Sequence, residues 1–138
     1  MSIKPLNVVL VEDDEVDAMN VRRAFERAKI QAPLFRAGDG VEALDLLRSP
    51  STPTARRLVL LDLNLPRMNG IEFLRELRAD EGLRKTPVVV LTTSDDEGDK
   101  EDAFDLFVAG YLLKPVTFGS FVDLMANLDR YWTHAEMP

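Results

Sequence analysis

Short apolar runs alternate with segments of helical periodicity along this chain. Three of the runs are nearly continuous, at residues 8–11, 58–63 and 88–91. Runs of this kind are typical of parallel strands that are covered on both faces of a sheet. Two weaker strand candidates lie at residues 34–37 and 111–113. The pattern therefore predicts five strands.

Between and after these runs, apolar residues recur with the spacing of one helix face. Five such faces are present: Ala18, Val21, Phe25 and Ala28; Val41, Leu44 and Leu47; Ile71, Leu74 and Leu77; Phe104, Phe107 and Val108; and Phe118, Phe121, Val122, Met125, Leu128 and Trp132. Right-handed crossover helices return a chain to a parallel neighbouring strand. We therefore expect an α/β fold, a doubly wound five-stranded parallel sheet flanked by five helices.

The length of 138 residues fits one domain. The linker-like stretch at residues 49–54 is too short to divide domains, so we expect a single domain over residues 1–138, with a core at about 6–131 and a short C-terminal tail. Residues 1–5 lack the apolar region of a secretory signal, and no run reaches the roughly 18 residues of a membrane span. With no cysteine, a disulfide scaffold and a thiolate site are excluded. These features favour a cytoplasmic protein.

The net charge of −7 is concentrated in two segments. Residues 12–17 and 95–102 together carry −10, so the rest of the chain is slightly basic. An acidic surface argues against nucleic acid as a partner. Two acidic clusters that folding brings together would instead favour a divalent cation.

Chemically active side chains follow the predicted strands. The first strand runs into Glu12 and Asp13, the third into Asp62, the fourth into Thr92 and the fifth into Lys114. In an open parallel sheet, ligands bind beyond the carboxyl ends of the strands. Crowded carboxylates need a cation, and oxygen ligands without His or Cys select a hard one such as Mg²⁺.

Asp62 is the most informative of these residues. It ends an apolar strand, and a partly buried carboxylate costs free energy unless it is paired. An isolated Asp after a strand more commonly caps the next helix. Cation ligands and a lysine at the neighbouring strand ends favour a catalytic role instead.

Four motifs together make the sequence resemble a response-regulator receiver domain of the single-domain, chemotaxis-receiver kind. They are VLVED at 9–13, DLNLPRMNG at 62–70, LTT at 91–93 and GYLLKP at 110–115. The resemblance implies the flavodoxin-like receiver fold and a phosphorylatable response regulator of a two-component system. Such a protein accepts a phosphoryl group from a sensor histidine kinase and switches its protein-binding surface. It catalyses its own phosphorylation and dephosphorylation but has no turnover substrate.

The resemblance also implies roles for single residues. Asp62 is the phosphoacceptor, which attacks a phosphohistidine on the kinase. Asp13 and Asp62 ligate Mg²⁺ directly, the backbone carbonyl of Asn64 adds a ligand, and Glu12 acts through water. Lys114 supplies positive charge to the phosphoryl group.

A switch pair is implied as well. The new phosphoryl group on Asp62 draws in the Thr92 hydroxyl, and Tyr111 rotates into the vacated space. The alternative is an ordinary strand-end Thr and a half-buried aromatic residue. By the same resemblance, the Lys114–Pro115 bond is a candidate for the cis isomer, which would direct the ammonium group inward.

For several other residues the sequence supports only weaker expectations. The acidic stretch at 95–102 is interpreted as the solvated start of the fourth helix, where carboxylates favour the helix dipole. Asp14 is expected at the rim of the site, and His134 in a polar tail is not expected to be a ligand. Gly70 is expected to open a helix or allow a close backbone approach.

The pair Tyr131-Trp132 near the C-terminus resembles receivers partnered with phytochrome-type sensor kinases. In that subfamily the last helix takes part in dimer contacts, which implies a homodimer through this helix and Trp132. Alternatively, Trp132 folds back on its own domain. The sequence leaves both open.

Three other functions remain as alternatives. An aspartyl-phosphate phosphatase of the haloacid dehalogenase type needs a second Asp two residues after the nucleophile, where this chain has Asn64. A flavodoxin-like flavin binder needs a hydroxyl- and glycine-rich phosphate loop, where this chain has acids from Glu12 onward. A phosphorylation-independent pseudoreceiver would not need the intact set of site residues that this chain has, Asp13, Asp62, Thr92 and Lys114.

Overall fold

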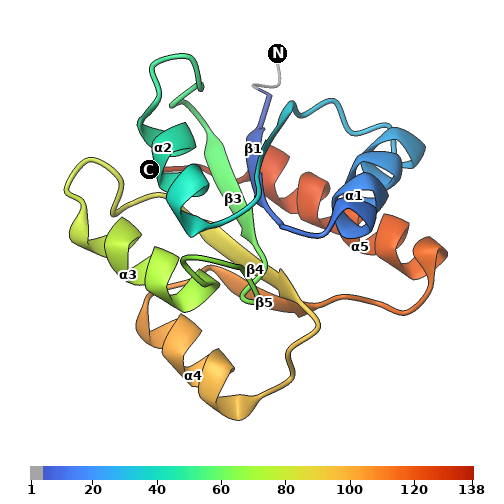
Figure 1. Ribbon diagram of the computed structural model, residues 1–138. Helices are drawn as coiled ribbons and strands as arrows, with labels where there is room; N and C mark the ends of the chain where they lie inside the picture. Colours follow the sequence, from blue (N-terminus) through green and yellow to red (C-terminus); the bar gives the residue numbers. More distant parts are fainter. Residues whose placement is uncertain (1–4) are drawn as a thin grey trace.

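Five parallel strands form one sheet in the computed structural model, which describes residues 5–138 (Figure 1). Residues 1–4 lie outside the described residues. The expectation that residues 1–5 are not a secretory signal falls mostly on them. The spatial order is β2-β1-β3-β4-β5. The strands are β1 (Asn7–Val11), β2 (Leu34–Ala37), β3 (Arg57–Leu61), β4 (Val88–Thr92) and β5 (Gly110–Leu113). The predicted doubly wound parallel sheet is confirmed.

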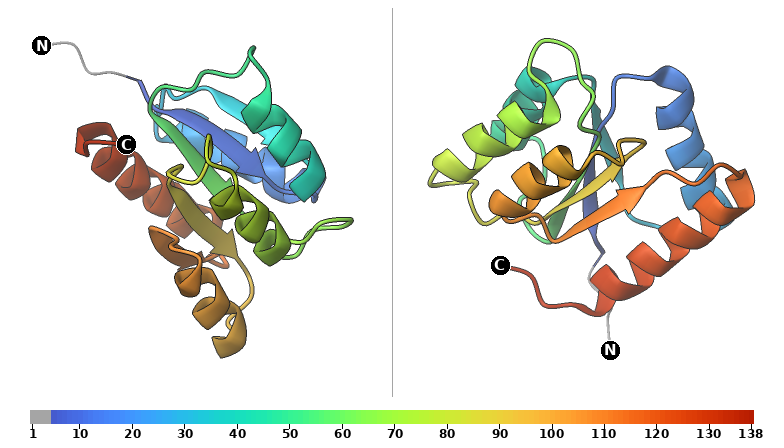
Figure 2. Two further views of the ribbon diagram at one scale, coloured as in Figure 1. Left: turned by 90° about the vertical axis from the view of Figure 1, so that its left-hand side faces the viewer. Right: turned by 90° about the horizontal axis from the view of Figure 1, so that it is seen from below.

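Each helix begins after a polar residue whose side chain accepts a hydrogen bond from a backbone N–H in the first turn. These N-cap residues are Asp14, Asp39, Asn69, Asp96 and Thr117. The helices that follow them are α1 (Glu15–Arg27), α2 (Gly40–Arg48), α3 (Gly70–Ala79), α4 (Glu97–Asp105) and α5 (Phe118–His134). α1 and α5 cover one face of the sheet and the other three helices cover the opposite face (Figure 2).

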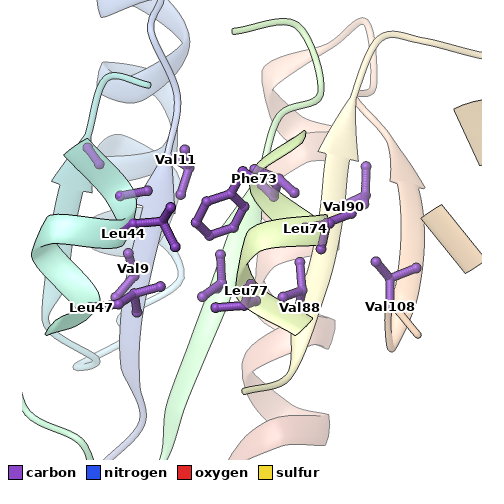
Figure 3. Close-up of a cluster of buried hydrophobic side chains, with 14 of the residues drawn as sticks. Val9, Val11, Leu44, Leu47, Phe73, Leu74, Leu77, Val88, Val90 and Val108 are labelled. Carbon is purple, nitrogen blue, oxygen red and sulfur yellow. The ribbon is translucent and has the colours of Figure 1, made fainter. Parts of the chain in front are cut away.

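The sheet separates two buried hydrophobic clusters. Side chains alternate between the faces of a strand, so Val9 and Val11 of β1 enter the cluster under α2 and α3, shown in Figure 3. Val8 and Leu10 enter the cluster under α1 and α5. Burial on both faces explains why the strands read as continuous apolar runs.

The second, fourth and fifth predicted apolar faces are partly wrong. In α2, Val41 is exposed, whereas Leu44 and Leu47 are buried. α4 ends before Phe107, whose φ of 61° and exposure of 78% place it outside the helix and outside the core. Phe104 is exposed as well, and α4 packs through Ala103 instead. Ala103 belongs to the cluster under α2 and α3. In α5, Phe118 is also largely exposed, so it is not core-facing.

Trp132 folds back on its own domain. It is 9% exposed and belongs to the cluster under α1 and α5, together with Leu6 and Met125. The guanidinium group of Arg56 donates to the carbonyls of Trp132, at 2.7 Å, and Ala135, at 3.2 Å. The neighbouring Tyr131 is exposed. Of the two alternatives for Trp132, the structure therefore shows the intramolecular one.

Candidate active site at the carboxyl edge of the sheet

The strand register brings the predicted residues to one edge of the sheet. Val11 of β1 pairs with Leu61 of β3, so the residues that follow them, Glu12 and Asp62, lie side by side. The backbone N–H of Asp62 donates to the Val11 carbonyl at 3.0 Å. On the other side, the Lys114 N–H donates to the carbonyl of Thr92 at 2.9 Å, although Lys114 lies beyond the end of β5.

Three carboxylates gather at this edge. Oxygen atoms of Glu12, Asp13 and Asp62 all lie within 4.8 Å of one another. Glu12 and Asp62 are buried, and Asp13 is exposed. The backbone N–H of Asn64 donates to Asp62 Oδ1 at 3.2 Å, which holds Asn64 beside the cluster. Oxygen donors alone fit a hard divalent cation better than a soft one.

Lys114 lies against these acids. Its Nζ contacts Glu12 Oε1 at 2.6 Å, Asp17 Oδ2 at 2.8 Å and Asp62 Oδ2 at 3.0 Å. An ammonium group has three hydrogens to donate, so each of them has a carboxylate partner. The ion pairs compensate the burial of these charges.

The acids and the lysine shift each other's protonation. Burial raises the pKa of Glu12 to about 7, although the hydrogen bond from Lys114 acts in the opposite direction. Burial of Lys114 disfavours its charge, but the hydrogen bonds to Asp17 and Glu12 and the nearby Asp62 charge outweigh it. The pKa of Lys114 therefore lies above its ordinary value.

Thr92 touches the central carboxylate. Its side chain is fully buried and its Oγ1 donates to Asp62 Oδ1 at 2.8 Å. Tyr111 lies farther out: its ring contacts the cluster under α2 and α3, and its hydroxyl donates to the Ser94 carbonyl at 2.8 Å. Burial raises the pKa of this hydroxyl. Thr92 is thus in direct contact with Asp62, whereas Tyr111 bonds to the loop that follows Thr92.

The Lys114–Pro115 bond differs from its expectation. All peptide bonds in residues 5–138 are trans, so the predicted cis bond is wrong. The trans isomer is the intrinsically favoured one even before proline. Lys114 reaches the acids from this backbone.

Two residues at the site were missed from the sequence. The sequence pattern marks Asp17 only as part of an acidic run, yet in the first turn of α1 its carboxylate contacts Lys114. Arg36 of β2 donates to the backbone carbonyls of Glu12, at 3.1 Å, and Asp13, at 3.2 Å. The charged residue inside a short apolar strand is the signal that could have identified Arg36.

The remaining marked residues lie largely as expected. Asp62 does not cap α3, because Asn69 does. Gly70 opens α3, and a Cβ there would lie 2.6 Å from Leu63 Cα, which confirms the close approach. Asp14 caps α1 rather than joining the acidic cluster. The ring Nδ1 of His134 is 2.8 Å from the carbonyl oxygen of Arg130 in α5, one turn earlier.

The acidic stretch at 95–102 also lies as expected, at the start of α4. Asp96 caps the helix, and acids occupy its first turn. Lys100 pairs with Asp95 and Glu97 within the stretch. These carboxylates lie at the positive end of the helix dipole.

The family description "response regulator receiver domain" fits residues 8–126 of this chain. The chain belongs to this family. The probable methanogenesis regulatory protein FilR2 of Methanothrix harundinacea is 39% identical over 130 residues, which cover 93% of this chain and 84% of FilR2. Response regulator Rcp1 of Synechocystis is 32% identical over 93% of this chain and 89% of its own length.

Solved structures of receivers share the fold. The phosphorylated cyanobacterial phytochrome response regulator RcpA superposes with a TM-score of 0.86 at 32% identity, covering 98% of this chain and 99% of RcpA. The Mn²⁺-bound form of Rcp1 gives a TM-score of 0.83 over 97% and 99%. The receiver is thus a phosphorylatable response regulator of two-component signalling, from a family that binds divalent metal. Among residues 5–138, no helix is long and apolar enough to span a bilayer.

Proposed function

We propose that this receiver takes a phosphoryl group on Asp62 from a sensor histidine kinase, with Mg²⁺ held at the acidic cluster. One observation carries the proposal: the Asp62 carboxylate accepts hydrogen bonds from both Lys114, at 3.0 Å, and Thr92, at 2.8 Å, beside two further acids. Asp13, Asp62 and the Asn64 backbone carbonyl would hold the cation, and Glu12 would act through water.

The transfer forms one bond and breaks one. An Asp62 carboxylate oxygen attacks phosphorus, and the bond from phosphorus to the donor's imidazole nitrogen breaks, with its electron pair passing to that nitrogen. The cation would neutralise charge on the carboxylates and on the phosphoryl oxygens. Lys114 donates a hydrogen bond to a phosphoryl oxygen, and the Thr92 hydroxyl donates to another. Neither residue needs a new backbone position, because both already contact Asp62.

The switch is part of the same proposal. Thr92 moves from the carboxylate to the phosphoryl group, and the Tyr111 ring follows into the space that Thr92 leaves. The ring is half-buried and its hydroxyl makes one hydrogen bond, to the Ser94 carbonyl, which supports this movement. The output is then a changed protein-binding surface, and the receiver has no turnover substrate.

The partner that fits best is a kinase of the phytochrome type, because RcpA is described as a phytochrome response regulator. We place this exchange in the cytoplasm, in a single receiver domain that binds neither nucleic acid nor membrane. A homodimer through α5 also belongs to the proposal. Because Trp132 is buried, its contacts would come from exposed side chains of α5 such as Tyr131.

Labelling tests the phosphoacceptor. Incubation with an acyl phosphate and Mg²⁺ is expected to add one phosphoryl group by intact-mass measurement, and Asp62→Asn is expected to prevent it. Asp45→Asn removes an equal charge from the exposed side of α2 and serves as the control. A phosphoryl group on the Asp62→Asn variant would assign the acceptor elsewhere. If the wild-type chain takes no label from any donor, it is a binding-only receiver.

Chelation tests the cation. EDTA is expected to stop labelling while the circular dichroism of the folded chain persists, since both hydrophobic clusters consist of apolar side chains and include none of the acids that would hold the cation. Unfolding on chelation would make the cation structural.

For the dimer, sedimentation of Tyr131→Ala is expected to show weaker self-association than the wild type. An unchanged monomer–dimer distribution would contradict the α5 interface.

A further inference from the structure

Asp17 has a contact with the site that the roles proposed above do not use. We propose that Asp17 is a positioning residue, which keeps the Lys114 ammonium group directed at Asp62 during phosphoryl transfer. This inference rests on the proposed role of Asp62 as the phosphoacceptor. The observation that supports this inference is the contact of 2.8 Å between Asp17 Oδ2 and Lys114 Nζ.

The first turn of α1 holds the backbone of Asp17 in place. Asp17 is the third residue of α1, and its backbone N–H donates to the N-cap side chain of Asp14 at 3.0 Å. This bond sets the start of the helix and thereby the direction of the Asp17 side chain. The contact with Lys114 therefore joins a fixed helix turn to a side chain with several rotatable bonds.

The three partners of Lys114 differ in what else they serve. Glu12 and Asp62 belong to the cluster of acids whose oxygens lie close enough to share a cation. Asp17 does not belong to it. When a cation draws on the first two carboxylates, Asp17 is the partner left entirely to Lys114. A divalent cation also repels the ammonium group, so the attraction of Asp17 is then needed most.

The surroundings give Lys114 room to turn away. Asp17 and Lys114 line a cleft of about 340 Å³ between α1 and the loop before α5, together with Asn20 and Pro115. The side chain of Lys114 is 13% exposed and that of Asp17 is 40% exposed. Without the Asp17 carboxylate, the ammonium group can move into this cleft and away from the phosphoacceptor.

Position in the first helical turn does not by itself explain the contact. Carboxylates are favourable at any helix start because of the helix dipole. Glu15 lies in the same turn, but it pairs with Arg36 and is largely exposed. The Asp17–Lys114 pair is therefore a specific feature of the site rather than a general consequence of α1.

A first experiment measures the interaction energy of the Asp17–Lys114 pair in metal-free protein. Asp17→Asn, Lys114→Met and the double variant are unfolded with urea in EDTA. We expect the destabilisation by Asp17→Asn to be lost when Lys114 is already Met, since the partner is then absent. Additive effects of the two substitutions would overturn the pairing. Glu26→Gln, at an exposed site on α1, controls for the removal of one negative charge.

A second experiment measures the rate of phosphorylation. At saturating donor and Mg²⁺, we expect the maximal rate of Asp17→Asn to fall about tenfold, because a misplaced catalytic group costs rate even when the donor is bound. The Mg²⁺ concentration for half-maximal rate is expected to stay within about twofold, since Asp17 lies outside the cation cluster. Asp17→Glu, which retains the charge, should recover part of the rate.

The outcomes separate this inference from the proposed function. A wild-type chain that is not labelled at Asp62 contradicts the proposed function, whereas the urea cycle still measures the ion pair. A labelled wild type with an unchanged or faster Asp17→Asn variant contradicts the positioning role. An equal loss of rate in Glu26→Gln does so too, because it would assign the effect to net charge.

Discussion

Gly70→Ala tests how closely the phosphoacceptor loop is packed against α3. A Cβ at this position would lie 2.6 Å from Leu63 Cα, 2.8 Å from Leu63 Cδ2 and 2.9 Å from the carbonyl oxygen of Asp62. Carbon atoms rest at about 3.5–4.0 Å, so the loop or α3 must shift by about 1 Å. Two of these contacts are with backbone atoms, which cannot rotate away. We expect a loss of about 1–3 kcal/mol in the free energy of unfolding.

The same shift should reach the chemistry. Displacing a reacting group by about 1 Å can cost about 10²-fold in rate, and the strained segment begins at Asp62 itself. We therefore expect phosphorylation of Gly70→Ala by an acyl phosphate to slow by up to that factor. Urea unfolding and the time course of labelling by intact mass measure the two effects separately.

Gly119→Ala in α5 is the matched control. A Cβ there meets no heavy atom within 4 Å, so alanine should leave stability unchanged or raise it by up to about 1 kcal/mol. Its labelling rate should equal that of the wild type. A Gly70→Ala variant as stable and as active as Gly119→Ala would refute the close approach of α3 to the Asp62 loop.

Three further predictions concern the Thr92 hydroxyl, the Arg56 guanidinium group and the Glu12 carboxyl group. Thr92→Val removes the buried hydroxyl that donates to Asp62; we expect about 1–3 kcal/mol lower stability in urea, and an unchanged midpoint would contradict it. Arg56→Ala removes donors to three carbonyls of the C-terminal segment, so Trp132 fluorescence should shift to the red. An identical spectrum would count against this anchor. In metal-free protein, burial raises the pKa of Glu12 to about 7 in the folded chain. Protonation of Glu12 therefore contributes its full stabilisation below pH 4.5 and progressively less up to about pH 7. The stability of wild type relative to Glu12→Gln should therefore fall over that window, by up to about 1.4 kcal/mol per pH unit; parallel curves would refute it.

The strand ends were predictable because local pattern and topology agree there. Apolar runs define strands buried on both faces, and parallel strands end at a common edge. That rule alone brings Glu12, Asp62 and Thr92 together, as the register shows. The helix caps were partly predictable for a similar reason, since capping depends on residues within one turn.

What the sequence could not predict depends on orientation between elements. Asp17 reaches Lys114 only because α1 is rotated so that Asp17 faces the residue that follows β5, and no local pattern specifies that rotation. Arg36 reaches the backbone of Glu12 from an edge strand. In α4, periodicity favoured Phe104, yet Phe104 is exposed and Ala103 of the same helix is fully buried in the cluster under α2 and α3. Which side of a short, mostly polar helix is buried depends on how it packs on its neighbours, which its own sequence does not specify.

The acids around Lys114 outnumber its single positive charge. Three carboxylates, those of Glu12, Asp17 and Asp62, contact this ammonium group, and a fourth, that of Asp13, lies beside Glu12 and Asp62. With all of them ionised, the site would carry a charge of −3, which burial penalises. The pKa of Glu12 near 7 shows where this penalty is relieved, because a proton on Glu12 removes one negative charge. A cation at the cluster and a proton on Glu12 therefore compete for the same excess charge. Asp17 lies outside that competition, since it contacts only the lysine and is half exposed to solvent. The site thus divides its acids between those that a cation can use and one that remains with Lys114.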